Sequence, residues 1–371
     1  MLTNKKIAIV YDWFDKWGGV ERILLILKKI FPQAVFFTSY FDKKKASWAN
    51  KFNIKTSFLQ NFPNFLRTSR ILSIPFYPFV FETFDFSKYD LVISITSSFA
   101  KSVITHPKTK HICYLLTPTR FLWSHEKDYF KNKNFFINNY LNYLKKWDLI
   151  VSKRPDKMIS ISKTVQKRCQ KYYKIKSDLI YPPFDDEYWA KIKLKIKKQK
   201  LKIKIKDKNF FLIVSRLEPY KKIDFVIKAF NNLNENLVII GDGSQEKKLK
   251  KIANKNIIFF SRLTDEELAY FYLNAKTLIM PQNEDFGYVS LESQFFNCPV
   301  IAYKQGGALE TVIENKTGIF FEKQNETSLI KTIERFNEIK YNLKKTISIY
   351  SSKNLERFSK EKFIKNLLKI I

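Results

Sequence analysis

Cysteine is scarce in this sequence, with three residues, Cys113, Cys169 and Cys298, among 371. They lie far apart, and none belongs to a CxxC pair or to a set with the spacing of metal ligands. This pattern argues against a disulfide framework and against a zinc site, and it is typical of reduced cysteines in a cytosolic protein. We therefore expect a cytoplasmic location.

Long apolar runs are also missing. The N-terminal residues lead directly into a strand-like segment at 6–11, and no hydrophobic region of signal-peptide type precedes it. The most apolar stretch, 71–84, is shorter than a membrane span and contains Pro75, Pro78 and Glu82. We expect a chain that does not cross a membrane, although it can still bind to a membrane surface.

Acidic residues are few relative to basic ones: 35 against 67 gives a net charge of +32. The electrostatic field of so large a positive charge attracts polyanions, which include nucleic acids, anionic membranes and phosphorylated substrates. The joint richness in Lys, Asn, Ile, Phe and Tyr offers a second explanation, a compositional bias of the genome, and both stay open. No RRM, KH or zinc-finger signature is present, so we expect no nucleic-acid partner.

Short apolar segments alternate with helical patterns along the whole chain, which predicts βαβ units with parallel sheets. A prolyl break at 181–186, followed by a Lys- and Ile-rich stretch at 191–208, interrupts this alternation. The predicted strands are 6–11, 34–38, 90–95, 111–115, 157–161 and 178–181 before the break, and 210–215, 236–241, 256–260, 277–280, 299–303 and 318–321 after it. The predicted helices include 19–30, 126–146, 163–173, 326–345 and 352–370, and a capping box, Thr264 with Glu267, begins another.

These patterns predict an α/β protein with two Rossmann-like, doubly wound domains. We place the N-terminal domain at 1–184 and the C-terminal domain at 185–351, with a linker at 185–208 and a separate final segment at 352–371. Open sheets of this kind bind ligands at the carboxyl ends of their strands, so the candidate site residues are sought there.

Two carboxylates follow the predicted strand 277–280. Glu284 lies in the loop, Phe286 and Gly287 begin a helix, and Glu292 stands about two turns into it. Each carboxylate can accept hydrogen bonds from two hydroxyls, which suits a polyhydroxylated ligand, and backbone N–H groups at the helix start can assist. A helix-capping acid together with a solvated helical Glu is the alternative interpretation of the pair.

A pair of cations follows the predicted strand 210–215. Arg216 lies at the strand end, and Lys221 lies in the expected first turn of the next helix, where a cation opposes the helix dipole. A bound diphosphate would explain both, with the guanidinium as a planar fork and the ammonium as a point charge. A solvated Lys-rich turn is the alternative in so basic a chain.

Two glycine turns follow strands, Gly18-Gly19 after the first and Gly241-Asp242-Gly243 in the second half. Glycine allows a backbone to approach a phosphate closely, and it also permits a tight connection without any ligand. Both explanations stay open for the second turn. No clear DxD motif is present, and the closest match, Asp185-Asp186-Glu187, lies in the predicted linker.

Taken together, these motifs resemble family 4 glycosyltransferases, which are retaining enzymes of GT-B architecture. The resemblance covers nearly the whole chain. It implies two domains that face each other across a cleft, a final helix that crosses back to the first domain, and no bound metal or other cofactor besides the nucleotide-sugar substrate. It rests on Gly18-Gly19, on Ser215-Arg216 with Lys221, on Glu284 and Glu292 with seven residues between them, and on 299–303 and 306–312.

The resemblance also implies roles for individual residues. Arg216 and Lys221 would bind the donor diphosphate, assisted by Gly18 and Gly19, and with Glu284 they form the predicted catalytic set. Glu284 would contact the donor sugar together with the backbone of Phe286 and Gly287. Glu292 would bind the ribose, while Gly241 and Leu263 would lie near the base. Thr117 and Arg120 are the candidate acceptor-side residues.

Further segments resemble bacterial mannosyltransferases of O-antigen and polysaccharide assembly, which implies GDP-mannose as the donor and a glycan or lipid-linked acceptor. Those segments are Asp12-Trp13, 56–60, 81–85 and 181–183. One position departs from the pattern, because Leu116 stands where relatives carry a His before Thr117-Pro118. UDP-glucose, UDP-N-acetylglucosamine or a deoxyhexose donor therefore stays open.

Two other interpretations concern the reaction and the membrane. A nucleotide-sugar epimerase or a phosphorylase would share the architecture, although the paired acids beside Arg216 and Lys221 favour transfer.

Basic and aromatic residues alternate within 58–84, among them Phe65, Arg67 and Arg70. This segment is either a buried, irregular part of the first domain or a surface for anionic lipid, which would place the protein on the inner face of the plasma membrane.

Overall fold

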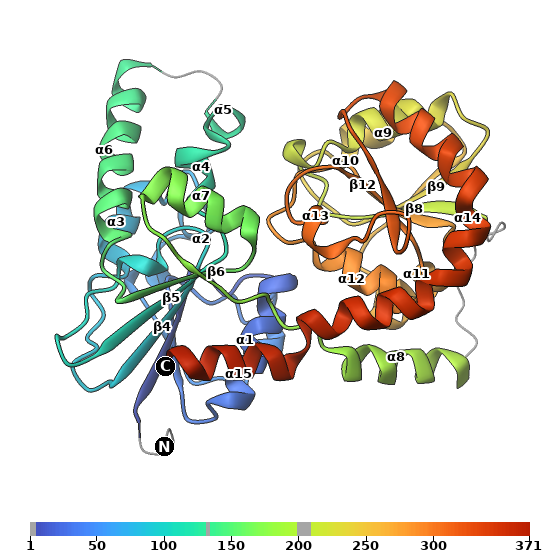
Figure 1. The fold of residues 1–371 in the computed structure, drawn as a ribbon. Coiled ribbons are helices and arrows are strands. Elements are labelled where there is room, and N and C mark those ends of the chain that lie inside the picture. The colour runs from blue at the N-terminus through green and yellow to red at the C-terminus, as the bar shows by residue number, and fades with distance from the viewer. Residues whose placement is uncertain (1–4, 131–133, 199–208) are drawn as a thin grey trace. The chain divides into compact units, whose positions relative to one another are not determined.

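The structure is a computed structural model that describes residues 5–130, 134–198 and 209–371. The chain divides into two compact units, Met1–Pro182 with Phe363–Ile371, and Pro183–Lys362. Figure 1 shows the strands and helices of both units. Both consist of a parallel sheet with helices, as the alternation of apolar segments predicts.

The first unit is built on a seven-stranded sheet in the order β3-β2-β1-β4-β5-β6-β7, in which every neighbouring pair is parallel. All residues of the central strands β1 and β4 are buried, because helices cover both faces of such a sheet. The strands are β1 (Ile7–Tyr11), β2 (Val35–Thr38), β3 (Ile54–Thr56), β4 (Leu91–Thr96), β5 (Lys110–Leu115), β6 (Lys157–Ser160) and β7 (Asp178–Leu179). The helices are α1 (Gly19–Ile30), α2 (Asn64–Thr68), α3 (Tyr77–Val80), α4 (Arg120–Trp123), α5 (Glu126–Tyr129), α6 (Phe135–Val151) and α7 (Lys163–Tyr173).

The second unit has a six-stranded parallel sheet in the order β10-β9-β8-β11-β12-β13. The strands are β8 (Phe210–Val214), β9 (Asn236–Ile240), β10 (Ile257–Phe260), β11 (Thr277–Met280), β12 (Val300–Tyr303) and β13 (Gly318–Phe321). The helices are α8 (Asp186–Lys198), α9 (Ile223–Asn231), α10 (Glu246–Ile252), α11 (Asp265–Asn274), α12 (Tyr288–Phe295), α13 (Ala308–Thr311) and α14 (Glu326–Leu355). The last helix, α15 (Lys360–Ile370), begins in this unit and ends in the first one.

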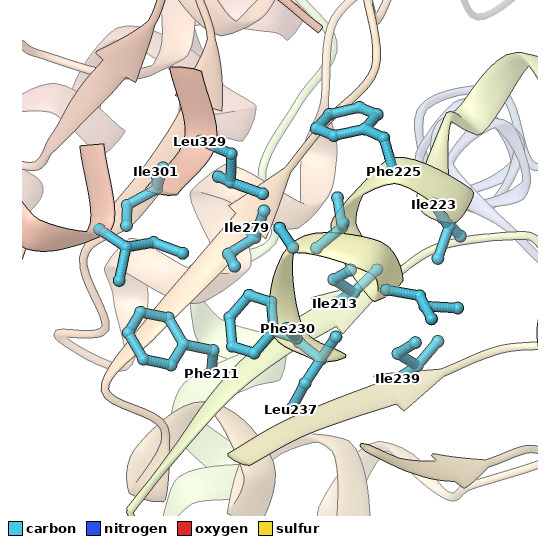
Figure 2. Packing of buried hydrophobic residues seen from close by; sticks show 14 of the residues in the cluster. Phe211, Ile213, Ile223, Phe225, Phe230, Leu237, Ile239, Ile279, Ile301 and Leu329 are labelled. Atoms are coloured by element: carbon cyan, nitrogen blue, oxygen red, sulfur yellow. The ribbon is translucent and has the colours of Figure 1, made fainter. Parts of the chain in front are cut away.

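The core of the second unit follows from the period of its apolar residues. Phe211 and Ile213 of β8 belong to one buried cluster, in which Phe230 of α9 packs against Phe211 and Leu329 of α14 lies near Ile279 and Ile301 (Figure 2). The helix α9 contributes residues spaced three and four apart, which puts them on one face. The capping box predicted for α11 is confirmed, since Thr264 and Glu267 exchange hydrogen bonds of 3.2 and 2.8 Å.

Three expectations about helices were wrong, and one strand was missed. The predicted helix 352–370 is divided, because α14 ends at Leu355 and α15 begins only at Lys360. The predicted helix 126–146 is two helices, α5 and α6, and the strand β3 was not predicted. The helix predicted to stop at 345 runs on to Leu355, because Ile347, Ser351 and Asn354 continue its buried face. The side chain of Asn354 donates to Gln294 Oε1 at 2.9 Å and to the Thr311 carbonyl at 2.8 Å, which holds the helix end to the second unit.

The segment 185–208 is not a linker over its first part. Residues 186–198 form α8, in which Trp189 and Ile192 are 1% and 4% exposed. Trp189 packs edge-on against Phe296, and Lys195 pairs with Glu266 of α11 at 3.2 Å. The buried side chains of Trp189 and Ile192 thus pack the helix into the second unit, and the rest of the stretch, 199–208, lies outside the described residues.

Candidate functional site

The candidate site of the second unit lies at the carboxyl edge of its sheet. The strand order changes direction between β8 and β11, and a doubly wound sheet binds its ligand at such a switch point. The predicted residues follow four strands that are neighbours at this edge: Arg216 follows β8, Gly241 follows β9, Leu263 follows β10 and Glu284 follows β11. The sheet topology therefore gathers residues that are far apart in the sequence.

The loop that carries Glu284 is fixed by the next connection along the sheet. The backbone N–H of Gly307 donates to the Glu284 carbonyl at 2.7 Å, and Glu284 forms a parallel bridge with Gly306. A Cβ on Gly307 would lie 2.3 Å from the Phe286 carbonyl oxygen, so only glycine allows this approach. The 306–307 turn thus sets the position of the Glu284 backbone.

Glu284 and Lys221 form an ion pair at the switch point. The Lys221 ammonium contacts Glu284 Oε1, and the two side chains are 9% and 17% exposed. Gln282 donates to the same carboxylate oxygen through Nε2 at 2.7 Å. Since Lys221 follows β8 and Glu284 follows β11, the pair joins the two central strands of the sheet.

The placement of Lys221 differs from the prediction. It ends a short 3-10 turn, Pro219–Lys221, and α9 begins only at Ile223, after Lys222 in the left-handed conformation. Lys221 is therefore outside the first turn of that helix, and the Glu284 carboxylate offsets its buried charge. The helix dipole of α9 therefore does not explain why Lys221 needs an anionic partner.

Arg216 is exposed at the same edge, where its guanidinium donates to the Tyr220 hydroxyl at 2.7 Å. Gly241 lies next to this segment, and a Cβ on it would be 1.9 Å from the Ser215 carbonyl oxygen. The close packing of two connections explains the glycine without a ligand. Leu263, beyond β10, is partly exposed.

The rest of the acidic motif belongs to α12, for which Gly287 is the N-cap. Glu292 is 5% exposed, and its Oε2 accepts a hydrogen bond from the Tyr272 hydroxyl at 3.0 Å. The Phe286 ring is also buried and packs edge-on against Tyr288 and Phe358, with ring centroids 5.4 Å apart in both pairs. Glu292 is thus a buried, hydrogen-bonded acid rather than a solvated helical Glu.

The remaining predicted residues belong to the first unit, again at strand ends. Gly18 is the N-cap of α1 and Gly19 is the first residue of that helix, and both are half-buried. Thr117 follows β5 and is 1% exposed, with no hydrogen-bond partner for its hydroxyl among the described residues. Arg120 begins α4 and is half-buried.

Asp12 occupies the switch point of the first unit, between β1 and β4. Its Oδ1 accepts from Thr96 Oγ1 and from the backbone N–H groups of Phe99 and Ala100 at 2.8 to 2.9 Å, and its Oδ2 accepts from the Ser97 N–H at 2.8 Å. This fully buried carboxylate fixes the connection after β4. The sequence marks it only as part of the Asp12-Trp13 resemblance.

Sequence reasoning missed Gln282, Tyr220 and Tyr272, which contact Glu284, Arg216 and Glu292 respectively. Gln282 and Tyr220 lie within four residues of the groups they touch, so their proximity in sequence was a usable signal. Tyr272 belongs to a different helix from Glu292, and no sequence pattern connects the two.

The chain is similar to known glycosyltransferases in sequence. Residues 195–354 match the family model described as glycosyl transferases group 1. An uncharacterized glycosyltransferase of Methanocaldococcus jannaschii is 29% identical over 221 residues, which are 58% of this chain and 59% of that protein. A GDP-mannose-dependent α-(1-6)-phosphatidylinositol monomannoside mannosyltransferase of Mycolicibacterium smegmatis is 31% identical over 130 residues, 30% of this chain and 34% of that protein.

Among solved structures, HepE of Anabaena in complex with UDP superposes with a TM-score of 0.70 and 17% identity, over 98% of this chain and 99% of that one. The chain spans 59% or less of the length of the two curated relatives described above. The fold is therefore GT-B, and residues 195–354 are similar to the glycosyl transferases group 1 family.

Proposed function

We propose that the chain is a retaining hexosyltransferase that moves a hexose from a nucleoside diphosphate donor to a glycan or lipid-linked acceptor. The observation that carries the proposal is the Lys221–Glu284 ion pair at the switch point of the glycosyltransferase domain, with Arg216 exposed at the same edge. A cation suited to phosphate and an acid suited to sugar hydroxyls are thereby adjacent, as a nucleotide sugar requires.

The diphosphate is bound by Arg216 and Lys221 in this proposal, assisted by Gly18 and Gly19. An ammonium carries three N–H donors, so Lys221 is able to bind a phosphate oxygen and keep one contact with Glu284. The exposed guanidinium of Arg216 offers a bidentate fork for the second phosphate, and Tyr220 holds it near the edge of the sheet.

In this proposal Glu284 and Glu292 bind the sugar and the nucleoside of the donor. Glu284 accepts hydrogen bonds from the hexose hydroxyls, assisted by the backbone of Phe286 and Gly287, and Glu292 accepts from the ribose. Tyr272 orients the Glu292 carboxylate through its hydroxyl. Gly241 and Leu263 lie beyond the neighbouring strands, where the base would be bound.

The proposed reaction breaks the bond between the anomeric carbon and the diphosphate oxygen, and forms a bond from that carbon to an acceptor oxygen on the same face. The acceptor proton passes to the departing diphosphate, so no side chain is assigned as the base. Arg216 and Lys221 stabilise the charge that develops on the leaving group, which is the main catalytic contribution. Thr117 and Arg120 are the proposed acceptor-side groups.

For the donor we propose GDP-mannose. The resemblance to mannosyltransferases supports it, as does the mycobacterial relative, whose name specifies GDP-mannose. The HepE structure contains UDP, so a uridine nucleotide is the natural competitor. Leu116, which is 6% exposed, replaces the polar residue expected there, and an unpaired sugar hydroxyl costs about 1–3 kcal/mol. A deoxyhexose donor is therefore the first alternative for the sugar.

A donor screen tests the proposal. Nucleotide release is measured with GDP-mannose, UDP-glucose, UDP-N-acetylglucosamine and a deoxyhexose donor, for the natural chain and for Leu116→His. We expect the highest turnover with GDP-mannose, and a further gain for mannose in the variant. A different preferred donor overturns the mannose assignment, and the absence of release with every nucleotide sugar overturns the proposed activity.

We also propose that the first unit binds an anionic membrane surface from the cytoplasmic side, next to a lipid-linked acceptor. No helix in the described residues is both long and apolar enough to span a bilayer. Within 58–84, Phe65 and Phe79 are 69% and 59% exposed, whereas Tyr77 is buried. The segment is thus partly core and partly surface, and Ile74 packs it against the buried face of α6.

The opposite face of α6 strengthens the membrane proposal. Phe136, Tyr143 and Ile150 are seven residues apart and 79%, 53% and 65% exposed, and the exposed Lys146 lies on the same face. Apolar residues with interspersed lysines suit the interface of an anionic bilayer. We expect co-sedimentation with anionic vesicles that weakens at high salt and falls in Phe136→Ser but not in the second-unit control Tyr341→Ser. Equal binding to neutral vesicles contradicts it.

A further inference from the structure

We propose that Gln282 is a positioning residue that holds the Glu284 carboxylate while the Lys221 ammonium turns to the donor diphosphate. The inference rests on the proposed function, in which Lys221 and Glu284 serve the two parts of one nucleotide sugar. It adds a residue to which neither the sequence motifs nor the comparisons give a role.

The geometry that supports this role is the convergence of two donors on one oxygen. Glu284 Oε1 accepts from the Lys221 ammonium and from Gln282 Nε2, the latter at 2.7 Å. Gln282 is 2% exposed and stands two residues before Glu284 in the same loop. Its amide is thus held at a fixed distance from the carboxylate, because the loop backbone is itself fixed by the Gly307 N–H.

The two donors differ in what a bound nucleotide does to them. Lys221 is cationic, and a diphosphate competes with Glu284 for its ammonium. Gln282 is neutral and has little attraction for a phosphate, so its bond to Oε1 persists when the ammonium moves. The carboxylate then keeps its orientation toward the sugar hydroxyls at the moment when its ionic partner is shared.

The amide oxygen of Gln282 gives an independent reason to look for a role beyond stability. This oxygen is buried and accepts no hydrogen bond from the described residues. The opposite orientation of the amide would place its oxygen against the Glu284 carboxylate, so the contact with Glu284 fixes the orientation. A buried amide with an unpaired acceptor destabilises a fold, and an apolar side chain of the same length would serve the fold better.

The test compares Gln282→Met in the full chain with the natural protein, using the donor selected by the screen. We expect kcat to fall by about 10- to 100-fold, because the carboxylate loses its fixed orientation. The donor KM and the affinity for nucleoside diphosphate should stay within about twofold, and the melting temperature should be unchanged or higher. Asn283→Ala is the matched control, since its side chain is exposed and donates to Gln305 at 3.2 Å.

A double-mutant cycle shows whether Gln282 acts through Glu284. In a Glu284→Asp background, adding Gln282→Met should lower kcat by much less than it does in the natural protein. Equal losses in both backgrounds, or a parallel loss of melting temperature, overturn the inference. If Gln282→Met keeps full kcat while Glu284→Ala and Lys221→Ala collapse transfer, only this inference fails. If those two variants also retain transfer, the proposed active site fails.

Discussion

Lys221 and Glu284 are 63 residues apart in the sequence, yet the Lys221 ammonium contacts the Glu284 carboxylate at the switch point of the second sheet. Their side chains are mostly buried, so each ion offsets the cost of removing the other from water. In the proposed function, this pair places a cation for the diphosphate next to an acid for the sugar. Variants of Glu284, Arg216 and Lys221 separate these roles.

Replacing Glu284 by Ala should lower transfer by about 100-fold or more while the affinity for nucleoside diphosphate is retained or rises. In the proposed function Glu284 contacts the sugar, and its loss would free Lys221 for phosphate. Steady-state transfer and calorimetric titration of the nucleotide measure the two effects. Glu322→Ala, at an exposed pair with Lys304, is the control. Near-normal turnover in Glu284→Ala would remove it from the site.

Replacing Arg216 or Lys221 by Ala should weaken the binding of nucleoside diphosphate by about 1.5–3 kcal/mol, the contribution of a charge-assisted contact. Lys221→Ala should also lower the free energy of unfolding, because Glu284 loses its ionic partner. Titration and urea unfolding measure these changes, with the exposed Lys228→Ala as control. Unchanged affinity in both site variants would mean that the phosphates bind elsewhere.

Gly307→Ala should destabilise the protein by about 1–3 kcal/mol and reduce transfer. The new Cβ would meet the backbone of Phe286 at 2.3 to 2.6 Å, so the loop that carries Glu284 must move. Gly18→Ala is the comparison for stability, since its Cβ would meet the Glu21 carboxylate at 3.1 Å, at the end of a flexible side chain. Equal melting temperatures for the two variants would contradict the account of this loop.

Acid should destabilise the first unit through His111. Burial lowers the pKa of His111 from 6.5 to about 3, while Ser94 Oγ lies 2.8 Å from its Nε2. At a pH between these two pKa values, His111 binds a proton in the unfolded chain but not in the folded chain. The free energy of unfolding therefore falls as the pH decreases, by up to about 1.4 kcal/mol per pH unit.

His111→Gln should reduce that slope in urea unfolding followed between pH 7 and 4. His106→Gln, at an exposed position, should leave the slope unchanged. A slope in His111→Gln as steep as in the natural protein would assign the acid sensitivity to other groups.

Much of the fold could be predicted from the sequence because the signals are local. The apolar period of α9 and the capping box of α11 lie within one element each, and the alternation of strands and helices indicated two parallel sheets. The strand β3 has three residues, too few for a pattern. The extension of α14 depends on the contacts that Asn354 makes with Gln294 and Thr311, which local propensity does not contain.

Part of the candidate site could likewise be predicted from the sequence, and part could not. The sequence by itself determined which residue types follow which strands, since parallel strands put Arg216, Gly241 and Glu284 at one sheet edge. Only the tertiary structure decided that Lys221 pairs with Glu284, that Gln282 donates to the same oxygen and that Tyr272 holds Glu292. Two of these contacts join separate loops or helices, and the Gln282 contact depends on how one loop is folded. Hydrogen bonds of this kind follow from side-chain direction and distance, which a one-dimensional pattern does not specify.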